Sequence, residues 1–523
     1  MRDLRSARVT RRHFTAQLLQ ASAAVLAARA VVSAPSAGPV ILTGQLPSVS
    51  SGVMSGDVSA DSAVIWSRAD RAARMIVEWS TRESFTDLKR VTGPLTGPEA
   101  DFTAKLMLGD LPAGERIFYR VHFEDTSGRG AGEPVVGQFV TAPRDERDVL
   151  LAWSGDTCGQ GFGTSPDRRG MKTYAAIRET RPDFFIHSGD TIYADNPIGP
   201  GFKFADGTEW RNLVADEKAK VAETLAEFRA AHRYNLFDEH VRGFNATTSV
   251  LAQWDDHEVR NNWYPGQKLL DDPRYQEKDV NVLASRARQA FFDYQPVRPS
   301  TDRLIYRTVS RGPLCELFFL DLRSYRGPNS LNRQRERSTE TAFLGDTQLA
   351  WLKQALLRSK SAWKIICSDM PLALLVSDGS TNWEAFANGD HGAPLGREWE
   401  IADLLRFLQA QRIRNVIWLT ADVHYAASHY YDPAKAKFAE FDPFWEFVSG
   451  PLHAGSFGPN ALDQTFGPEA RWNSRSPGSV SAGPHTPEQY FGTVRIDGKS
   501  KVATVTHFNR DGARLWSIDL PPA

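Results

Sequence analysis

The chain has 523 residues, of which 41% are hydrophobic and 24% are charged. This composition is that of a folded globular protein and excludes disordered and fibrous classes. The net charge of −1 leaves no broad basic face, so no nucleic-acid-specific binding is expected. Three cysteines in so long a chain exclude a disulfide framework.

Residues 1–34 have the pattern of an export signal. Five arginines lie within the first twelve residues, and an apolar, alanine-rich stretch follows from Phe14 to Ala34. The segment TRRHFT at 10–15 resembles a twin-arginine signal, which addresses folded proteins to the twin-arginine export machinery. A plain secretory signal is the alternative. Cleavage is expected at Ala28-Arg29-Ala30 or at Val32-Ser33-Ala34.

No later stretch of 18 apolar residues follows this segment, so no membrane span is expected after signal cleavage. The expected location is therefore the periplasm or the exterior of a bacterial cell. Export in the folded state suits a protein that acquires its cofactor before it leaves the cytoplasm.

Residues 44–143 are predicted to form an all-β domain. Short apolar segments such as Ser62–Ser67, Ile117–Phe123 and Val135–Val140 are separated by turns rich in Gly, Pro and Asp. Short strands at this spacing are typical of a fibronectin-like or Ig-like β-sandwich. Because no cluster of catalytic residue types is visible here, we interpret this domain as a packing or spacer module.

From residue 148 to residue 520, apolar strands alternate with helical patterns. Val149–Trp153 and Asn415–Leu419 are predicted strands, and Asp346–Ser359 is a predicted helix with its leucines on one face. This alternation indicates an α/β fold with layers of helices on buried strands. The stretch 435–488, rich in Gly, Pro and Ser, is predicted to form loops near a cleft.

Several predicted strands lead directly into aspartates. These residues are Asp156, Asp190, Asp255 with Asp256, and Asp422. The carboxyl ends of strands line the ligand crevice in open α/β sheets. Carboxylates gathered in one crevice repel each other and require a counter-charge, which a metal ion supplies most simply. The sequence therefore predicts a metal centre.

Each aspartate is followed by a further candidate ligand. These are Cys158 after Asp156, Tyr193 after Asp190, Asn261 and Asn262 after Asp256, and His424 after Asp422. His424 lies two residues after Asp422, on the same face of an extended segment. The alternatives are an inert core cysteine and a packed tyrosine. We interpret His257 as a phosphate-facing acid or hydrogen-bond donor, with a strand cap as the alternative.

These motifs together resemble the alkaline phosphatase D (PhoD-like) family. The matching segments are GDTCGQG (155–161), HSGDTIYAD (187–195), WDDHEVRNNW (254–263), LDLRSYR (320–326) and TADVHY (420–425). The resemblance covers essentially all of the mature chain. It implies the calcineurin-like metallophosphoesterase superfamily, a relation to purple acid phosphatases, and a four-layer αββα sandwich behind the β-domain. Cys158, Asp256 and Asp422 replace the His, Asn and His of the wider superfamily pattern.

The resemblance also implies Fe³⁺ together with Ca²⁺, and a colour from charge transfer between a tyrosinate and iron. The ligand types divide accordingly: Cys158, Tyr193 and His424 suit a transition metal. Asp256, Asn261 and Asp422 suit a hard cation. Asp190 is placed to bridge the two ions, and Asp156 fits either. Asn261, five residues after Asp256, is preferred to Asn262 as the ligand.

We therefore predict an exported phosphoesterase that hydrolyses phosphate monoesters and diesters through a metal-bound hydroxide, with His257 assisting. Arg323 is a candidate to grip the phosphate of the substrate, and a buried ion pair between Asp321 and an arginine is the alternative. Rival functions are a dedicated phosphodiesterase or phospholipase-D-type enzyme, a metal-dependent hydrolase of another ester class, and a catalytically inactive binding module.

Overall fold

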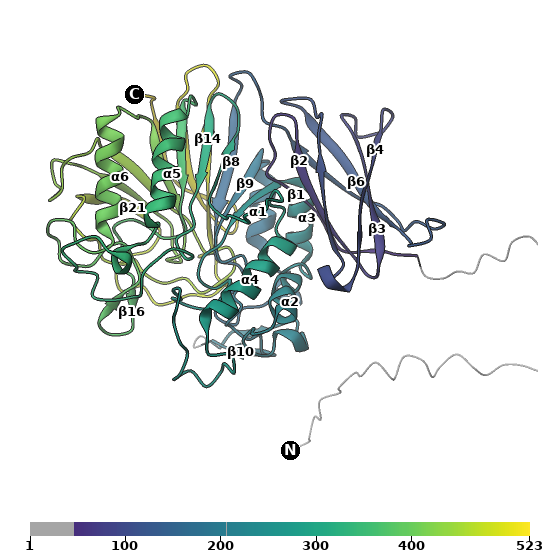
Figure 1. Cartoon of the computed structure of the whole chain (residues 1–523), viewed down its shortest axis with the longest axis horizontal. Coiled ribbons are helices and arrows are strands. Elements are labelled where there is room, and N and C mark those ends of the chain that lie inside the picture. The colour runs from purple at the N-terminus through teal and green to yellow at the C-terminus, as the bar shows by residue number, and fades with distance from the viewer. Residues whose placement is uncertain (1–45, 205–206) are drawn as a thin grey trace, which may run out of the picture. The chain divides into compact units, whose positions relative to one another are not determined.

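Two large β-sheets form the centre of the fold in the computed structural model, which describes residues 46–204 and 207–523 (Figure 1). The predicted export signal lies outside the described residues. Within them, no helix has the length and apolar character needed to cross a membrane.

The first sheet has nine strands, and its centre is parallel. The spatial order is β24 (Arg514–Leu520), β23 (Ala503–Asn509), β22 (Tyr490–Ile496), β8 (Val149–Ser154), β9 (Phe184–Ser188), β12 (Ser249–Gln253), β1 (Val49–Gly56), β2 (Ala63–Ala69) and β5 (Thr103–Leu108). Strands β8, β9, β12 and β1 pair in parallel, and both ends of the sheet are antiparallel. The carboxyl ends of β8, β9 and β12 therefore meet at one edge.

The second sheet has seven strands. Their spatial order is β13 (Arg307–Ser310), β14 (Cys315–Phe319), β15 (Trp363–Cys367), β18 (Val416–Thr420), β20 (Phe444–Val448), β19 (Ala427–Tyr431) and β21 (Pro468–Asn473). Strands β14, β15, β18 and β20 pair in parallel. Two small hairpins, β10–β11 (Gly201–Lys203, Glu209–Arg211) and β16–β17 (Ser377–Asp378, Asn382–Trp383), lie outside both large sheets.

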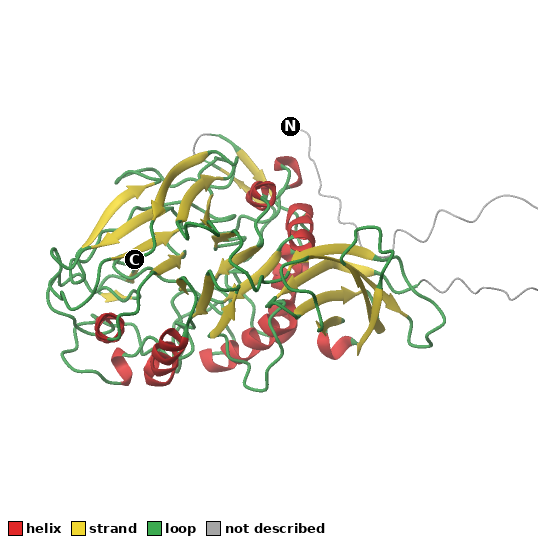
Figure 2. Cartoon of the chain, turned by 90° about the horizontal axis from the view of Figure 1, so that it is seen from above, coloured by secondary structure: helices red, strands yellow, loops and turns green. Residues whose placement is uncertain are grey.

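Helices cover the outer faces of the two sheets (Figure 2). The nine-stranded sheet packs against α1 (Lys172–Thr180), α2 (Leu225–Asn235), α3 (Glu239–Thr247) and α4 (Val280–Tyr294). The seven-stranded sheet packs against α5 (Gly345–Arg358) and α6 (Glu398–Ala410). A third apolar cluster, which includes Trp153 and Leu419, joins the sheets to each other. The predicted four-layer αββα arrangement is confirmed.

The central strands read as continuous apolar runs because both of their faces are buried. In β9, Phe184 and Ile186 belong to the cluster between the sheets, whereas Phe185 belongs to the cluster under the helices. Neighbouring residues of a strand point to opposite faces, so each residue of such a run packs in one of the two apolar clusters.

The predicted N-terminal β-sandwich is also confirmed, and three of its strands belong to the nine-stranded sheet. Strands β1, β2 and β5 pack through an apolar cluster on a four-stranded sheet of β4 (Lys89–Thr96), β3 (Ala73–Ser80), β6 (Arg116–Glu124) and β7 (Val135–Val140). Gly56 of β1 pairs with Val250 of β12 in parallel. Backbone oxygens of Val250 and Pro296 lie where a Cβ at Gly56 would stand, so this junction requires glycine. The sandwich therefore braces the edge of the site-bearing sheet.

The stretch 435–488 differs from the prediction, because it contains β20 and β21 as well as loops. Strand β20 (FWEFV) is flanked by turn-rich sequence and is only five residues long, which hides it from a periodicity analysis. Its pairing with β18 supplies the signal that the local sequence lacks.

Candidate metal centre

Four loops that follow strand ends bring the predicted aspartates to one edge of the two sheets. Asp156 follows β8, Asp190 follows β9, Asp256 follows β12, and Asp422 follows β18 of the other sheet. The first two loops are tied together directly, because the backbone N–H of Thr157 donates to the carbonyl of Asp190 at 2.8 Å.

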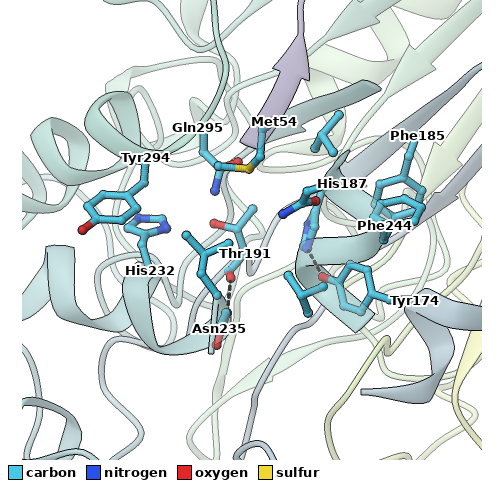
Figure 3. Close-up of a pocket in the computed structure, with 14 residues that line it drawn as sticks. Met54, Tyr174, Phe185, His187, Thr191, His232, Asn235, Phe244, Tyr294 and Gln295 are labelled. Atoms are coloured by element: carbon cyan, nitrogen blue, oxygen red, sulfur yellow. Dashed lines mark hydrogen bonds between the residues drawn. The ribbon is translucent and has the colours of Figure 1, made fainter. Parts of the chain in front are cut away.

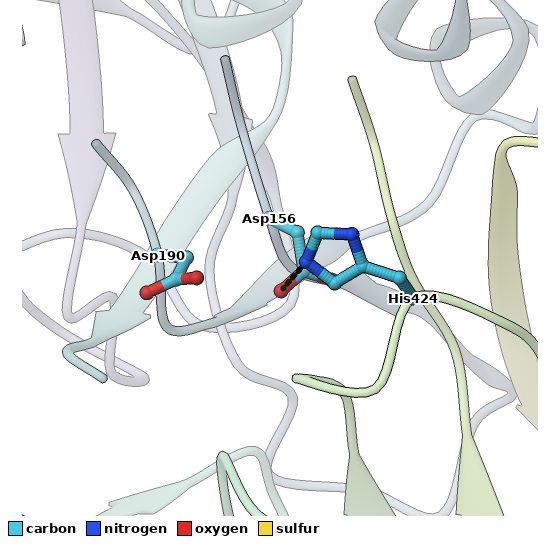
Figure 4. Close-up of side chains that lie close together, drawn as sticks. All are labelled: Asp156, Asp190 and His424. Carbon is cyan, nitrogen blue, oxygen red and sulfur yellow. Dashed lines mark ion pairs between the residues drawn. The ribbon is translucent and has the colours of Figure 1, made fainter. Parts of the chain in front are cut away.

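Two groups of potential metal ligands lie at this edge, and Asp190 belongs to both. In one group, ligand atoms of Asp156, Asp190 and His424 all lie within 4.8 Å of one another (Figure 4). In the other, the same holds for Asp190, Asp256 and His257. A carboxylate common to two such groups fits a residue that bridges two cations.

Many of these residues have a left-handed backbone, which is uncommon for residues other than glycine. The φ angles are +66° at Asp156, +50° at Asp190, +63° at Asp422 and +61° at His424. Cys158 shares this feature, with φ of +74°. Such conformations cost roughly 1–3 kcal/mol each and cluster at functional sites. The surrounding packing therefore holds these loops in a conformation that the local sequence does not favour.

One buried carboxylate of the first group, that of Asp156, lacks hydrogen-bond partners within the described part of the chain, whereas Oδ1 of Asp190 accepts from the backbone N–H of His257 at 3.1 Å. Neither oxygen of Asp156 has a hydrogen-bond partner among the described residues, although this side chain is only 1% exposed. Burial, together with the charge of Asp255, raises the pKa of Asp156 well above its usual range. Burial and the same neighbour raise the pKa of Asp190. A bound cation would remove this repulsion and satisfy the oxygens, so the residues fit a metal ion.

His424 is held in the tautomer that a metal requires. Its Nδ1 contacts the carbonyl of Gly455, so Nδ1 carries the proton and Nε2 keeps its lone pair. Nε2 accepts a hydrogen bond from the Tyr193 hydroxyl at 2.8 Å and lies 3.7 Å from Oδ1 of Asp156. Burial lowers the pKa of His424 to about 3, so the ring is neutral.

Neighbouring carboxylates favour the protonated form of His257. Its Nδ1 lies 2.6 Å from Oδ1 of Asp195, and its ring stacks on Tyr193 with 4.1 Å between the ring centres. Burial alone would lower the pKa of His257, but the charges of Asp195 and Asp256 raise it to about 9. Nε2 lies 3.9 Å from Oδ1 of Asp256 and faces the second ligand group. The positive charge of its ring makes His257 a proton donor at the second ligand group rather than one of its metal ligands.

Asp195 and Glu258 hold the loops of the site through contacts that no sequence motif indicates. Asp195 ends the segment HSGDTIYAD, and besides His257 it binds the backbone N–H of Asn261 at 3.0 Å. Glu258 accepts from the backbone N–H groups of Thr191 and Asp255 at 2.6 and 2.7 Å. It thereby joins the loops after β9 and β12. The signal for both residues was their position beside ligand aspartates, but their partners follow only from the fold.

Cys158 belongs to neither ligand group of the described residues. Its thiol is buried in the apolar cluster under the helices, and burial raises the pKa of the thiol to about 12. The loop that carries it nevertheless contacts the site, because a Cβ on Gly159 would lie 2.7 Å from the ring of Tyr193. Cys158 can reach a cation only if its side chain turns.

Asn261 is exposed, whereas Asn262 is half-buried. The backbone N–H of Asn262 donates to Oδ2 of Asp256 at 2.5 Å, and its side-chain nitrogen donates to Asp378 at 3.0 Å. This geometry favours Asn262 over Asn261, contrary to the preference drawn from spacing. The backbone of Asn262 is left-handed, with φ of +58°, a conformation that asparagine tolerates well.

Arg323 is fully buried and lies within a cluster of carboxylates. Its Nε donates to Oδ1 of Asp255 at 2.7 Å, and its Nη1 contacts Glu384. Oδ1 of Asp422 lies 3.9 Å from Nη2. This placement corresponds to the buried ion pair rather than to a phosphate grip, although the partners are Asp255 and Glu384. Asp321 instead accepts from the backbone N–H of Arg323 at 3.1 Å.

A separate polar cavity of about 50 Å³ lies behind β9 (Figure 3). His187, His232 and Asn235 line it, and each has a buried polar atom without a partner among the described residues. Asn235 donates to the carbonyl of Thr191, which connects this wall to the Glu258 junction. A polar space of this size suits ordered water rather than an organic substrate.

Comparison with known proteins identifies relatives over most of the chain. The family model for PhoD-like phosphatase matches residues 151–507, and the model for its N-terminal domain matches residues 36–143. Alkaline phosphatase D of Bacillus subtilis (strain 168) is 25% identical over 435 residues, which cover 78% of this chain and 70% of that protein.

Two solved structures share the fold. A structure of PhoD superposes with a TM-score of 0.65 at 18% identity, and covers 90% of this chain and 92% of its own. The purple acid phosphatase PPD1 from yellow lupin (Lupinus luteus) seeds superposes with a TM-score of 0.50 at 13% identity, covering 91% of this chain and 74% of its own. The fold is that of the metallophosphoesterases, and with the family model spanning most of its length, this chain belongs to the PhoD-like phosphatase family.

Proposed function

We propose that this chain is an exported, metal-dependent phosphoesterase that hydrolyses phosphate monoesters and diesters. The observation that carries this proposal is the pair of ligand groups that share Asp190, in a chain of the PhoD-like phosphatase family. The B. subtilis relative is named an alkaline phosphatase, which supports phosphoester hydrolysis as the reaction.

The proposed metals are Fe³⁺ and Ca²⁺, and the donor types divide between them. Asp156, Tyr193 and His424 would hold the iron, with Cys158 joining after its side chain turns. Asp256, Asp422 and Asn262 offer hard oxygens for calcium. Asp190 would bridge the two ions. When bound, such ions supply Lewis-acid chemistry that activates water and neutralises phosphate charge.

The residues of the chain position the phosphate and move a proton. His257 is cationic, with Nδ1 fixed by Asp195 and Nε2 facing the second ligand group. A proton at Nε2 can be donated to a phosphate oxygen or to the departing alkoxide. Asp195 acts as a positioning residue, because it sets the orientation of the imidazole ring.

The first test is hydrolysis of bis-p-nitrophenyl phosphate and p-nitrophenyl phosphate by the purified mature protein. Activity is measured before EGTA, after EGTA, and after Ca²⁺ or Mg²⁺ is added back. Loss with EGTA and recovery with Ca²⁺ alone is the expected result. Activity that is indifferent to EGTA would remove calcium from the proposal, and hydrolysis of neither ester by metal-loaded protein would overturn the proposed function.

Export by the twin-arginine route is a second part of the proposal. It is supported by the sequence TRRHFT at 10–15, ahead of an apolar segment. Replacing Arg11 and Arg12 by lysine should retain the protein in the cytoplasm, measured by cell fractionation. Continued export of the double variant would favour the plain secretory signal.

A further inference from the structure

Phe457 lies directly on the ring of His424 and is still open to solvent. The two ring centres are 4.6 Å apart with an angle of 21° between the planes, and Phe457 is 38% exposed. The imidazole beneath it points its Nε2 toward Asp156. An exposed phenyl ring therefore stands one side chain away from the proposed metal centre.

The exposure of Phe457 is not the result of a loose loop. The backbone N–H of Gly455 donates to Gln160 at 2.9 Å, and that of Ser456 donates to the carbonyl of Ala482 at 2.7 Å. The loop is also fixed on the other side of Phe457, because the backbone N–H of Asn460 donates to the Tyr425 hydroxyl at 3.1 Å. The fold holds an apolar ring at the surface where folding alone favours burial.

Further aromatic side chains adjoin the same loop. Phe162 would lie 3.7 Å from a Cβ on Gly455, and its ring packs edge-on to Phe202 with 4.9 Å between the centres. Phe202 is 37% exposed. A buried aromatic side chain, Phe162, thus adjoins the loop that carries Phe457 and joins it to the partly exposed Phe202.

We propose that Phe457 forms an apolar wall for the organic group of the substrate, so that the enzyme favours phosphoesters with an aromatic or bulky apolar substituent. This inference rests on the proposed function. A phosphate held at the two ligand groups carries its ester substituent past the ring that covers His424. An aromatic substituent gains by packing on a phenyl face, whereas a methyl or ethyl group offers little area for this contact.

The test compares phenyl phosphate with ethyl phosphate as substrates, with phosphate release as the readout. The variants are Phe457→Ala and Phe457→Leu, and the control is Phe237→Ala, another exposed phenylalanine outside the site. Each variant is compared with the wild type as the ratio of kcat/KM for the two esters, which cancels their different leaving groups. Iron content is measured in parallel.

Phe457→Ala should lower this ratio by about 5- to 10-fold, mostly through KM for phenyl phosphate, and Phe457→Leu by less. Phe237→Ala should leave the ratio unchanged. An equal fall on both esters, with or without loss of iron, would mean that the ring only supports His424 and would overturn the proposal. An unchanged ratio would overturn it too. A wild-type protein inactive on both of these monoesters, and on bis-p-nitrophenyl phosphate as well, would instead refute the proposed function itself.

Discussion

The hydroxyl of Tyr193 donates to Nε2 of His424 across 2.8 Å, and this contact joins the two sheets. Tyr193 follows β9 of one sheet, and His424 follows β18 of the other. Burial, followed by the charges of Asp190 and Asp156, raises the pKa of the Tyr193 phenol well above its usual range. The phenol therefore keeps its proton unless a cation takes the position between these side chains.

Tyr193→Phe should remove the colour of the iron-loaded protein. A phenolate bound to Fe³⁺ would give a visible charge-transfer band, and phenylalanine has no oxygen to supply it. The measurement is the visible spectrum and the iron content of wild type and variant. Tyr275→Phe is the matched control, because Tyr275 is buried and its hydroxyl has no partner among the described residues. A band that survives in Tyr193→Phe would exclude Tyr193 as the ligand.

Cys158→Ser tests whether the thiol turns toward the metal. The left-handed backbone that Cys158 shares with Asp156 and His424 argues that its position is functional. We expect the variant to lose at least half of its iron, measured by elemental analysis. Cys315→Ser is the control, because Cys315 is equally buried but lies between the sheets. Full iron content in Cys158→Ser would place the thiol among inert core residues.

The aspartates proposed for the site have a local signal in the sequence. Asp156, Asp190 and Asp422 each end an apolar run, and parallel strands place such ends together. The partners of these residues are not predictable in this way. Asp195 meets His257 62 positions later, and Asp255 meets Arg323 68 positions later. Such contacts depend on how loops from separate strands pack, which no local pattern encodes.

The fold, too, has parts that the local sequence predicts and parts that depend on contacts between distant segments. The layers were predictable because long amphipathic helices and buried strands have strong periodicity. By contrast, β20 has five residues and acquires its identity from pairing with β18. Asn261 and Asn262 differ in exposure and in their contacts, because Asn262 binds Asp256 and Asp378. Spacing along the sequence cannot reveal these contacts.

Arg323→Met should lower the free energy of unfolding by about 3–5 kcal/mol, because it leaves the carboxylates of Asp255 and Glu384 buried without the guanidinium that pairs with them. Urea unfolding of the variant and the wild type measures this difference. Arg406→Met, which breaks an exposed pair with Glu440, is the control and should change stability little. A variant of unaltered stability with a raised KM would restore Arg323 as a phosphate ligand.

Asn262→Ala should weaken calcium binding by tenfold or more, whereas Asn261→Ala should leave it unchanged. The side-chain nitrogen of Asn262 donates a hydrogen bond to Asp378, which leaves the side-chain oxygen of Asn262 available to a hard cation. Asn261 points its side chain to solvent. Isothermal titration calorimetry of Ca²⁺ with each EGTA-treated variant measures the two calcium affinities. The reverse order of effects would return the ligand role to Asn261.

His507 should make the protein less stable in mild acid. It is fully buried beside Trp472, with ring centres 5.1 Å apart, and burial lowers its pKa from 6.5 to about 3. Between these values the unfolded chain binds a proton that the folded chain does not. Stability is therefore unaffected by this residue above pH 6.5 and falls below it, by about 1.4 kcal/mol for each pH unit.

His507→Gln removes this proton while keeping a polar group near Ser428, which lies 3.1 Å from Nε2 of the histidine. Urea unfolding at pH 7, 6, 5 and 4.5 gives the free energy of unfolding of both proteins. The other buried histidines and any loss of metal contribute to both curves alike, so the difference isolates His507. The variant curve should fall less steeply below pH 6.5. Parallel curves would show that His507 titrates similarly in the folded and unfolded chains.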